Sequence, residues 1–437
     1  MVSTVVGQNV ASRPFRLDEL RTPPGFEVSV YARVSGSPRL MTIGPNGVLY
    51  VASRGNSIVA IPEAGRVVTV RGGLSGPHSV TFRGNDLYVG VNDGVVRFSN
   101  AVTEDLVIRN APERVVTFTV PPGTPNQHST RTAYFGPDGK LYLTAGSTCN
   151  FCVEQDPRRA AMTRYEADGS GETLFARGLR NTVGFAFHPV TGEIWGVDNG
   201  GDGLGDDDPP EEINIIRENQ DHGWPDCRGN RRGVNWGLQA RPGRCGETEP
   251  PEFEIPAHSA PLAISFYSGD MLPASWRNDA LVGLHGSWNR SGPSGFKVVR
   301  VRAADGRATA SQDLLWGFFD SSTRTRSGRP VHPISGSDGA VYVSDDATGN
   351  IYRIAYTGPR INPGGIVRVA PRIYELYGSR LVNDPAEFAV YANGVQVELL
   401  YAGAGQANFV LPENLAGDVT IAVKNEKAVD EILIRVE

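Results

Sequence analysis

The stretch that decides the fold runs from residue 178 to residue 225 and reads GLRNTVGFAFHPVTGEIWGVDNGGDGLGDDDPPEEINIIRENQDHGWP. A Gly-Leu-Arg-Asn turn enters a strand-like apolar segment, and the turn Val190-Thr191-Gly192 leads into a second one. The second segment ends in a loop rich in Gly and Asp, which is followed by Glu-Glu-Ile-Asn and later by Gly-Trp-Pro. The pattern predicts two short strands, joined by a tight turn, with an acidic loop at the far end.

The same hairpin pattern recurs along the chain as a turn with Gly, Asn or Asp followed by Leu-Tyr-Val or a similar triplet. Copies begin at Gly44, Gly84, Gly136, Thr191, Asn278 and Ser337. Gly and Asn tolerate the positive φ that tight turns require. Repeats of ~40–50 residues built from hairpins indicate propeller blades. The sequence therefore predicts an N-terminal extension (residues 1–24) and an all-β, six-bladed β-propeller (residues 25–356).

The sequence changes in character after the last repeat. Residues 357–362, with Gly358 and Pro359, predict a linker, and residues 363–437 contain short alternating strands. The pair Asn393-Gly394 is a hairpin signal. This tail suits a small β-sandwich. It resembles an immunoglobulin-like (Ig-like) module that is appended to secreted proteins, through Asn393-Gly394-Val395 and the segment GQANFVLP at 405–412.

Composition limits the classes of function. The chain has 437 residues, of which 40% are hydrophobic and 21% charged, as in ordinary soluble globular proteins. The formal net charge is -6 and no basic block with interleaved aromatics occurs, so no nucleic-acid partner is expected. No apolar run approaches the ~18 residues of a membrane helix, so no membrane span is expected.

The four cysteines lie in loop-like segments. Cys149 and Cys152 form a C-x-x-C, and Cys227 and Cys245 flank a loop rich in Arg and Gly. An even number in such positions favours two local disulfides and an oxidising compartment. The N-terminus lacks the charged and apolar regions of a signal peptide. We therefore expect a periplasmic or secreted protein whose signal peptide precedes this numbering, with a cytosolic protein as the alternative.

Candidate functional residues lie in the segments between the repeats. They are His128 before GPDGKLY, the pair Arg180-Asn181, the glycines Gly200-Gly201, His285 in HGSWNR with Lys297 after it, and Arg329 in SGRPV. These segments resemble the pyrroloquinoline quinone (PQQ) dependent sugar dehydrogenases of the soluble glucose and sorbosone dehydrogenase type. The resemblance covers about residues 25–356 and is specific at four spaced motifs.

The resemblance implies a cofactor pair and a reaction. PQQ and Ca²⁺ would be the cofactors, and a sugar (an aldose, sorbosone, or a related polyol or aldehyde) would be oxidised by hydride transfer to the quinone. An external electron acceptor, such as a cytochrome, a quinone or a dye, would complete the cycle. His128 stands where the family has its base, and histidine suits this role because its pKa lies near working pH. The alternative is a turn histidine that caps a strand.

PQQ carries three carboxylates and therefore favours cationic and hydrogen-bonding partners. The resemblance implies that these partners are Arg180, Asn181, His285, Lys297 and Arg329. Arg180 could instead bridge adjacent blades, and His285 could be a buried blade histidine. The sequence alone leaves both alternatives open.

The glycines Gly200 and Gly201 fall where the family offers two consecutive backbone carbonyls to calcium. Hard cations take oxygen ligands, and glycine lets the backbone approach closely. Asp202 and Asp206 would add carboxylates, although an acidic loop can simply be solvated. Glucose-oxidising members have Gly-Pro at this position and Pro-Gln-Gly after the Arg-Asn pair, where this chain has Thr-Val-Gly. These departures place it nearer the sorbosone or broad-aldose branch.

Two other functions remain open from the sequence. A propeller can bind carbohydrate or protein without catalysis. It can also act as a calcium-dependent hydrolase of the lactonase type, which would need carboxylate or amide ligands from several blades. Here the candidate ligands come mostly from one loop, which argues against the hydrolase.

Overall fold

The computed structural model describes residues 10–118, 127–382 and 384–436, and within these ranges it is almost entirely β-structure. Its helical segments there are short 3-10 turns: η1 (Leu17–Glu19), η2 (Pro242–Glu247), η3 (Ala274–Trp276) and η4 (Pro385–Glu387). None of the helices in the described ranges is long and apolar enough to cross a membrane. The predicted all-β class is confirmed.

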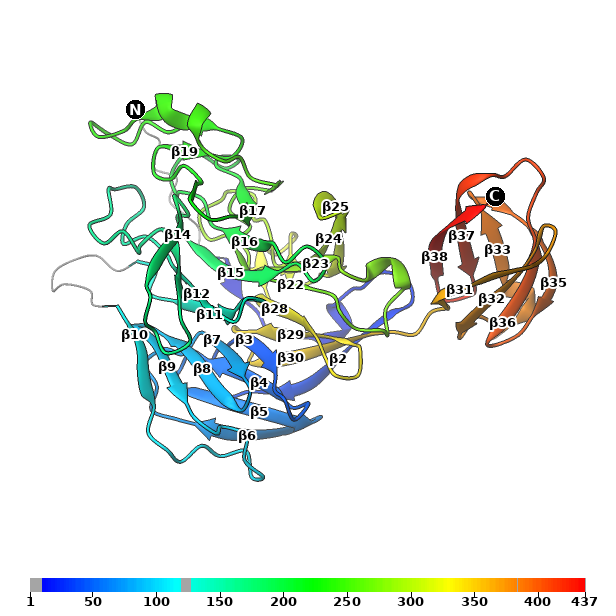
Figure 1. Ribbon diagram of the computed structural model, residues 1–437, viewed down its shortest axis with the longest axis horizontal. Helices are drawn as coiled ribbons and strands as arrows, with labels where there is room; N and C mark the ends of the chain where they lie inside the picture. Colours follow the sequence, from blue (N-terminus) through cyan, green and yellow to red (C-terminus); the bar gives the residue numbers. More distant parts are fainter. Residues whose placement is uncertain (1–9, 119–126, 383, 437) are drawn as a thin grey trace.

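Antiparallel sheets of four main strands account for most of the described residues from 26 to 356 (Figure 1). The first two after the N-terminus contain β3 (Pro38–Ile43), β4 (Leu49–Ser53), β5 (Ser57–Glu63) and β6 (Arg66–Arg71), and then β7 (Ser79–Arg83), β8 (Asp86–Val91), β9 (Gly94–Phe98) and β10 (Glu113–Thr117). The third contains β11 (Arg131–Phe135), β12 (Leu141–Ala145), β13 (Ala161–Tyr165) and β14 (Thr173–Arg177), with β18 (Gln220–Asp221) added in parallel.

The next sheets continue this order along the chain. They contain β15 (Thr182–Phe187), β16 (Ile194–Asp198), β17 (Glu211–Ile216) and β21 (Phe253–Ile255), and then β22 (Pro261–Phe266), β23 (Ala280–Leu284), β24 (Lys297–Ala304) and β25 (Arg307–Leu315). The last sheet combines β28 (Pro330–Ser335), β29 (Val341–Asp345) and β30 (Asn350–Tyr356) with β2 (Phe26–Arg33). Short pieces are β1 (Ala11–Ser12), β19 (Cys227–Arg228), β20 (Arg232–Gly233), β26 (Phe319–Asp320) and β27 (Thr325–Arg326).

The sheets are arranged as in a β-propeller. Their first strands contact one another in the cyclic order β3, β7, β11, β15, β22, β28 and back to β3. Strand β2 pairs with β30 from Phe26–Tyr356 to Arg33–Asn350, so the two ends of the ring share one sheet. Apolar side chains fill the space between neighbouring sheets, as Tyr50 and Phe98 do in one such core. The ring is held by this packing and by the pairing of its ends.

Each predicted hairpin turn lies between the first and second strand of a sheet. Gly136, for example, begins the turn between β11 and β12, and Ser337 lies in the turn between β28 and β29. Because these pairs are antiparallel, the start of each first strand faces the end of the second, as Thr182 faces Asp198. Segments before the first strand and after the second strand therefore gather at one edge of the ring, which we call the site edge.

Residues from 360 onward form a separate sandwich (Figure 1). One sheet contains β31 (Arg360–Ala370), β32 (Ile373–Ser379), β35 (Glu398–Ala402) and β36 (Gln406–Val410), and the other β33 (Ala389–Ala392), β34 (Val395–Gln396), β37 (Gly417–Lys424) and β38 (Val429–Val436). Leu376, Phe409 and Ile421 are fully buried in the core of the sandwich. Strand β31 begins inside the predicted linker. Ala428 packs in the same cluster as Trp276 of the ring and so joins the two parts.

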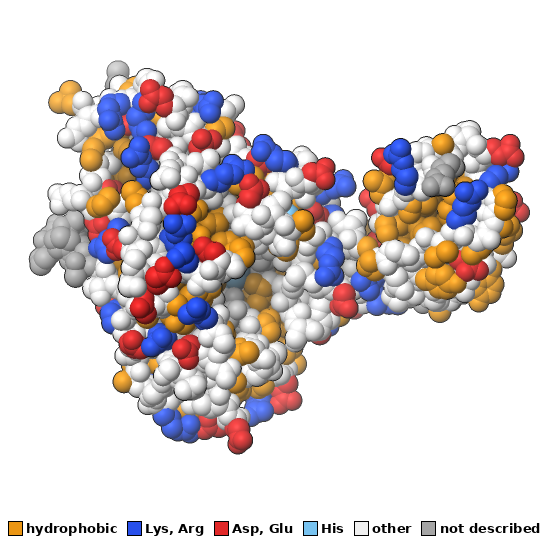
Figure 2. Space-filling model, in the orientation of Figure 1, with side chains coloured by type: hydrophobic (Ala, Val, Ile, Leu, Met, Phe, Trp, Pro, Cys, Tyr) orange, Lys and Arg blue, Asp and Glu red, His pale blue; other side chains and the backbone are white. Residues whose placement is uncertain are grey.

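The surface charge is mixed. Figure 2 shows acidic and basic side chains interspersed over the visible face of the ring, without a continuous basic surface. The net charge of -6 agrees with this picture.

Candidate active site

The imidazole of His128 lies just before β11, at the site edge. Its Nδ1 lies 2.8 Å from the carbonyl oxygen of Ser147 and 3.0 Å from the hydroxyl of the same residue. A carbonyl can only accept, so Nδ1 carries the proton and Nε2 is left with its lone pair. Burial and the charge of Arg180 lower the pKa of His128 to about 4. The ring is therefore neutral near pH 7, with a basic nitrogen to offer.

Asn181 and His128 meet at Gly146. An ideal Cβ on Gly146 would lie 2.5 Å from Oδ1 of Asn181 and 2.6 Å from Cβ of His128. Any side chain at this position would push the two residues apart, so glycine is needed. The backbone amide of Asn181 donates to Asp198 at 2.8 Å, which fixes the start of β15. The structure thus brings together two of the predicted residues from different sheets.

Arg180 is buried and joins two loops of the site edge. Its guanidinium donates to both the backbone and side-chain oxygens of Asn150, at 3.2 and 2.9 Å, and to the carbonyl of Asn199 at 3.0 Å. It also pairs with Asp202 at 3.2 Å. The bridging role that the sequence left open is therefore real. This bridging role is compatible with a ligand contact, because the same hydrogen bonds hold the guanidinium of Arg180 rigidly at the site edge.

The acidic loop follows β16 at the same edge. The amide of Gly200 donates to Glu211 at 2.7 Å, and a Cβ on Gly201 would lie 2.0 Å from the ring of Phe151. Asp202 accepts a hydrogen bond of 2.7 Å from Asn289. Asp206 lies apart from these contacts and accepts from Ser291. Gly200, Gly201 and Asp202 therefore lie beside Arg180, whereas Asp206 belongs to the outer part of the loop.

A second cluster lies where β23 and β29 end. Nε2 of His285 lies 2.8 Å from Asp346, and Arg39 donates to the other carboxylate oxygen at 2.5 Å. Arg329 donates to the backbone carbonyls of His285 and Gly286 at 3.0 and 2.6 Å. Burial lowers the pKa of His285 to about 4, although Asp346 opposes the effect. The structure thus makes His285 and Arg329 neighbours.

Arg39 and Asp346 were missed by sequence reasoning. Both occupy places that the other site residues share: Arg39 lies at the start of a first strand, and Asp346 follows a second strand. These positions in the repeat were the signal by which the sequence could have pointed to Arg39 and Asp346. Arg39 lies near the start of the ring's sequence and Asp346 near its end. Only the closure of the ring brings the two side chains together.

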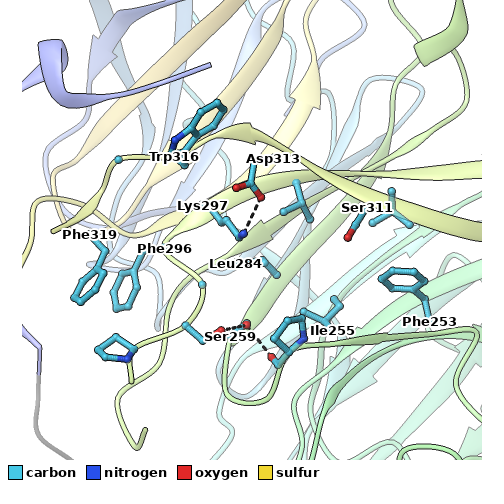
Figure 3. A pocket seen from close by; sticks show the side chains of 17 residues that line it. Phe253, Ile255, Ser259, Leu284, Phe296, Lys297, Ser311, Asp313, Trp316 and Phe319 are labelled. Atoms are coloured by element: carbon cyan, nitrogen blue, oxygen red, sulfur yellow. Dashed lines mark hydrogen bonds and ion pairs between the residues drawn. The ribbon is translucent and has the colours of Figure 1, made fainter. Parts of the chain in front are cut away.

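Lys297 faces a different space. It begins β24 at the site edge, but its ammonium pairs with Asp313 of β25 at 2.7 Å. Figure 3 shows this pair in a cavity of about 400 Å³, with Phe253 on one side and the stacked rings of Phe296 and Phe319 on another. The structure therefore turns Lys297 toward the outer strand of its sheet, away from the clusters around Arg180 and Arg329.

Buried carboxyl groups underlie the acidic loop. Burial raises the pKa of Asp198 to about 6 and that of Glu211 and Glu212 to about 8. Glu211 accepts from the amide of Gly200 and, at 3.2 Å, from that of Ala260. The motif Glu-Glu-Ile-Asn was visible in the sequence, but it gave no sign that Glu211 would be buried and Glu212 half-buried.

The electrostatics of the site edge suit an anionic ligand. Burial, aided by neighbouring arginines, lowers the pKa of Arg329 to about 10 and that of Arg131 to about 9, although Asp346 opposes the shift at Arg329. Buried cations that repel one another are stabilised by added negative charge. Backbone oxygens around Gly200 and Gly201, with Asp202, give the oxygen donors that a hard cation takes. The donor set fits both a ligand with several carboxylates and a calcium ion.

Comparison with known proteins identifies the family. The model of the family described as TrAA12-like matches residues 20–357. The chain belongs to this family. An uncharacterized protein of Borreliella burgdorferi is 32% identical over 350 residues, which is 77% of this chain and 91% of that protein. The sequence-based assignment to a PQQ-dependent sugar dehydrogenase family is confirmed at the family level.

Solved structures share the fold. The calcium structure of Trichoderma reesei Carbohydrate-Active Enzymes Family AA12 has a TM-score of 0.67 at 19% identity, covering 77% of this chain and 97% of that one. The holo form of the pyranose dehydrogenase PQQ domain from Coprinopsis cinerea has a TM-score of 0.67 at 22% identity, covering 79% and 98%. At these identities the similarity concerns the fold alone.

Proposed function

We propose that this protein is a PQQ- and calcium-dependent oxidoreductase that oxidises a sugar, with His128 as the base. The observation that carries the proposal is the neutral imidazole of His128, held through Nδ1 by Ser147 beside Asn181. Membership of the TrAA12-like family supports it, as does the name of the Coprinopsis cinerea PQQ domain among the structural neighbours. We propose more specifically that the sugar is an aldose, sorbosone, or a related polyol or aldehyde.

The residues of the site edge would divide the binding of the cofactors. Arg180, Asn181, His285 and Arg329 would hold the carboxylates and quinone oxygens of PQQ, since they come from different sheets and reach the same edge. Gly200 and Gly201 would offer carbonyl oxygens to Ca²⁺, with Asp202 and Asp206 as further candidates. When bound, the quinone supplies the two-electron acceptor for the sugar. Lys297 stays a sequence prediction, because its visible partner is Asp313.

The chemical task of His128 is to take the hydroxyl proton of the sugar. Its Nε2 is the acceptor because Nδ1 is committed to Ser147. The lowered pKa keeps the ring unprotonated at neutral pH. It also makes the imidazole a weaker base than a histidine of ordinary pKa. The charge of Arg180 disfavours the protonated ring, and bound carboxylates would offset that charge.

The proposal extends to architecture and location. Residues 25–356 would form a six-bladed β-propeller after an N-terminal extension (1–24), and residues 363–437 an Ig-like module after the linker 357–362. Both disulfides, Cys149–Cys152 and Cys227–Cys245, are present as predicted. Such pairs suit a periplasmic or secreted protein. An external cytochrome, quinone or dye would accept the electrons.

The test is dye-linked oxidation of a panel of aldoses and sorbosone by protein reconstituted with PQQ and Ca²⁺. Activity that needs both cofactors supports the proposal. Lactone hydrolysis that needs Ca²⁺ alone would favour the hydrolase. Sugar binding without oxidation in fully reconstituted protein would favour a non-catalytic propeller.

A further inference from the structure

The cavity beside Lys297 has no role in the proposed function. It has a volume of about 400 Å³ and lies between the sheet that ends in β21 and the sheet of β22 to β25. Its lining includes the aromatic rings of Phe253, Phe296, Trp316 and Phe319 (Figure 3). We call this space the aromatic cavity. Its volume falls within the ~300–1,000 Å³ that is typical of ligand sites.

The walls of the aromatic cavity are held in place without a ligand. Phe296 is 2% exposed, and its ring stacks on that of Phe319 with 5.4 Å between the ring centroids. The backbone of Phe296 has a φ of 56°, in the left-handed region that residues other than glycine rarely adopt. On another side, the backbone of Trp316 exchanges two hydrogen bonds with that of Arg21, at 2.9 and 3.0 Å. A preformed site of this kind has little conformational freedom left to lose when a ligand enters it.

Aliphatic side chains from both sheets complete the apolar part of the lining. Leu284, Val299 and Val301 come from β23 and β24, and Ile255 comes from β21. All four are at most 5% exposed. Walls of aromatic rings and branched aliphatic groups favour a flat apolar ligand. A sugar is disfavoured, because its several hydroxyls would lose their hydration against these walls.

One ion pair gives the aromatic cavity a polar end. Lys297 and Asp313 are the charged residues of its lining, and their ammonium and carboxylate groups lie 2.7 Å apart. Neither side chain makes a further hydrogen bond or ion pair with any residue that the structure describes. An ammonium has three N–H donors and a carboxylate about four acceptor sites, so both groups keep capacity for a ligand. A ligand at this end can accept a hydrogen bond from Lys297 and donate one to Asp313.

The charges of this pair narrow the class of ligand. A carboxylate ligand would be attracted by Lys297 but repelled by Asp313, and a cationic ligand would be repelled by Lys297. The neutral hydroxyl of a phenol meets neither penalty, because its oxygen can accept from the ammonium and its hydrogen can be donated to the carboxylate. An aromatic amino acid would match both charges, but it would bring two further charged groups out of water. The balance favours a phenol.

We propose that the aromatic cavity is a binding site for a neutral phenol. The phenol hydroxyl lies between Lys297 and Asp313, and the ring packs among Phe253, Trp316 and the aliphatic side chains of the lining. The inference goes beyond the proposed function, since the sugar, PQQ and Ca²⁺ are assigned to other residues of the site edge. It gives Lys297 a ligand other than PQQ.

Calorimetric titration of the full-length chain at neutral pH tests the class of ligand. The probes are para-cresol, its carboxylate analogue para-toluate, its saturated analogue methylcyclohexanol, and the zwitterion L-phenylalanine. We expect para-cresol to bind about tenfold or more tightly than each of the others. No saturable binding of para-cresol, or equal or tighter binding of any other probe, overturns the proposal.

Two variants of strand β25 locate the binding. Ser311 lines the cavity from an exposed position, so Ser311→Phe should fill the space without disturbing the core. The affinity for para-cresol should fall about tenfold or more. Gln312→Phe is the matched control, because successive residues of a strand point to opposite faces of the sheet, and it should keep the parental affinity. Equal affinities in Ser311→Phe and Gln312→Phe would overturn the assignment.

A third variant tests the polar end and keeps the proposal falsifiable if Ser311→Phe does not fold. Asp313→Asn removes the negative charge and weakens the acceptor for the phenol hydroxyl, so para-cresol should bind several-fold more weakly. The same change leaves Lys297 without its counter-ion, so para-toluate should bind more tightly than it does to the parent. Unchanged affinities for both probes in Asp313→Asn would overturn the proposal.

Discussion

Nδ1 of His128 lies 2.8 Å from the carbonyl oxygen of Ser147, a contact between the segment before β11 and the loop after β12. It decides the tautomer of the ring, because a carbonyl oxygen can accept but cannot donate. The amide of Ser147 in turn donates to the carbonyl of Arg180 at 2.8 Å. Ser147 therefore positions both residues: its carbonyl holds the ring of His128, and its amide holds the backbone of Arg180.

The first prediction concerns His128→Gln. Turnover of the best sugar should fall by about 10²–10⁴-fold, as expected for the loss of a general base. PQQ affinity should change little, because arginines and calcium would hold it. Ser147→Ala is the control: it removes the 3.0 Å hydroxyl contact and keeps the carbonyl contact, so turnover should fall far less. Parental turnover in His128→Gln would show that the ring is structural.

The second prediction concerns the buried pair of Arg39 and Asp346, whose side chains are 6% and 13% exposed. Asp346→Asn leaves the Arg39 guanidinium without its counter-ion, which should cost about 3–5 kcal/mol of unfolding free energy. Asp418→Asn breaks an exposed pair with Arg435 and should change the unfolding free energy little, because water and salt screen the two charges. Urea denaturation measures both. Equal losses of unfolding free energy in Asp346→Asn and Asp418→Asn would contradict the stabilising role of the buried pair.

Much of the fold could be predicted from the sequence because hairpin turns are local. The turn at Gly136 and the disulfide pairs depend on residues close together in the chain. The pair of Arg39 and Asp346 could not be predicted, since only the closure of the ring brings the two side chains together. The orientation of the Lys297 side chain could not be predicted either, because it depends on the acidic residue Asp313 in the neighbouring strand β25. The burial of Glu211 could not be predicted, because two adjacent acids usually indicate a solvated segment.

The third prediction concerns the disulfides. Replacing Cys227 and Cys245 by Ser should lower the unfolding free energy by about 2–4 kcal/mol, because the bridge spans a separation of 18 residues. The same change at Cys149 and Cys152, separated by 3, should cost less. Denaturation under non-reducing conditions checks the order. Peptide mapping that finds four free thiols under non-reducing conditions would contradict the pairing.

The fourth prediction concerns pH and Glu212. Burial raises its folded pKa from 4.5 to about 8, so between these values the folded state binds more protons than the unfolded state. The contribution of Glu212 to stability therefore decreases as pH rises through this window and is flat above it. Glu212→Gln removes the titration, and its carbonyl oxygen can still accept the 3.0 Å hydrogen bond that Glu212 accepts from the side-chain amide of Asn214.

Thermal melts in EDTA measure the effect. Glu212→Gln should exceed the parent by about 2–4 °C at pH 8.5, the shift that about 1 kcal/mol gives in a large domain. The difference should shrink toward pH 5, where the parent carboxyl is protonated in the fold. A difference independent of pH would show that Glu212 does not ionise in this window.

The central claim is that the site edge binds PQQ and passes electrons from a sugar to it. The most direct measurement is an absorbance titration of the metal-free protein with PQQ in the presence of Ca²⁺, followed by addition of sugar without any external acceptor. We predict saturation at one PQQ per chain, loss of binding in the double variant Arg180→Ala with Arg329→Ala, and a sugar-driven change to the spectrum of the reduced cofactor. No saturable binding, or a bound spectrum that no sugar alters, would contradict the account.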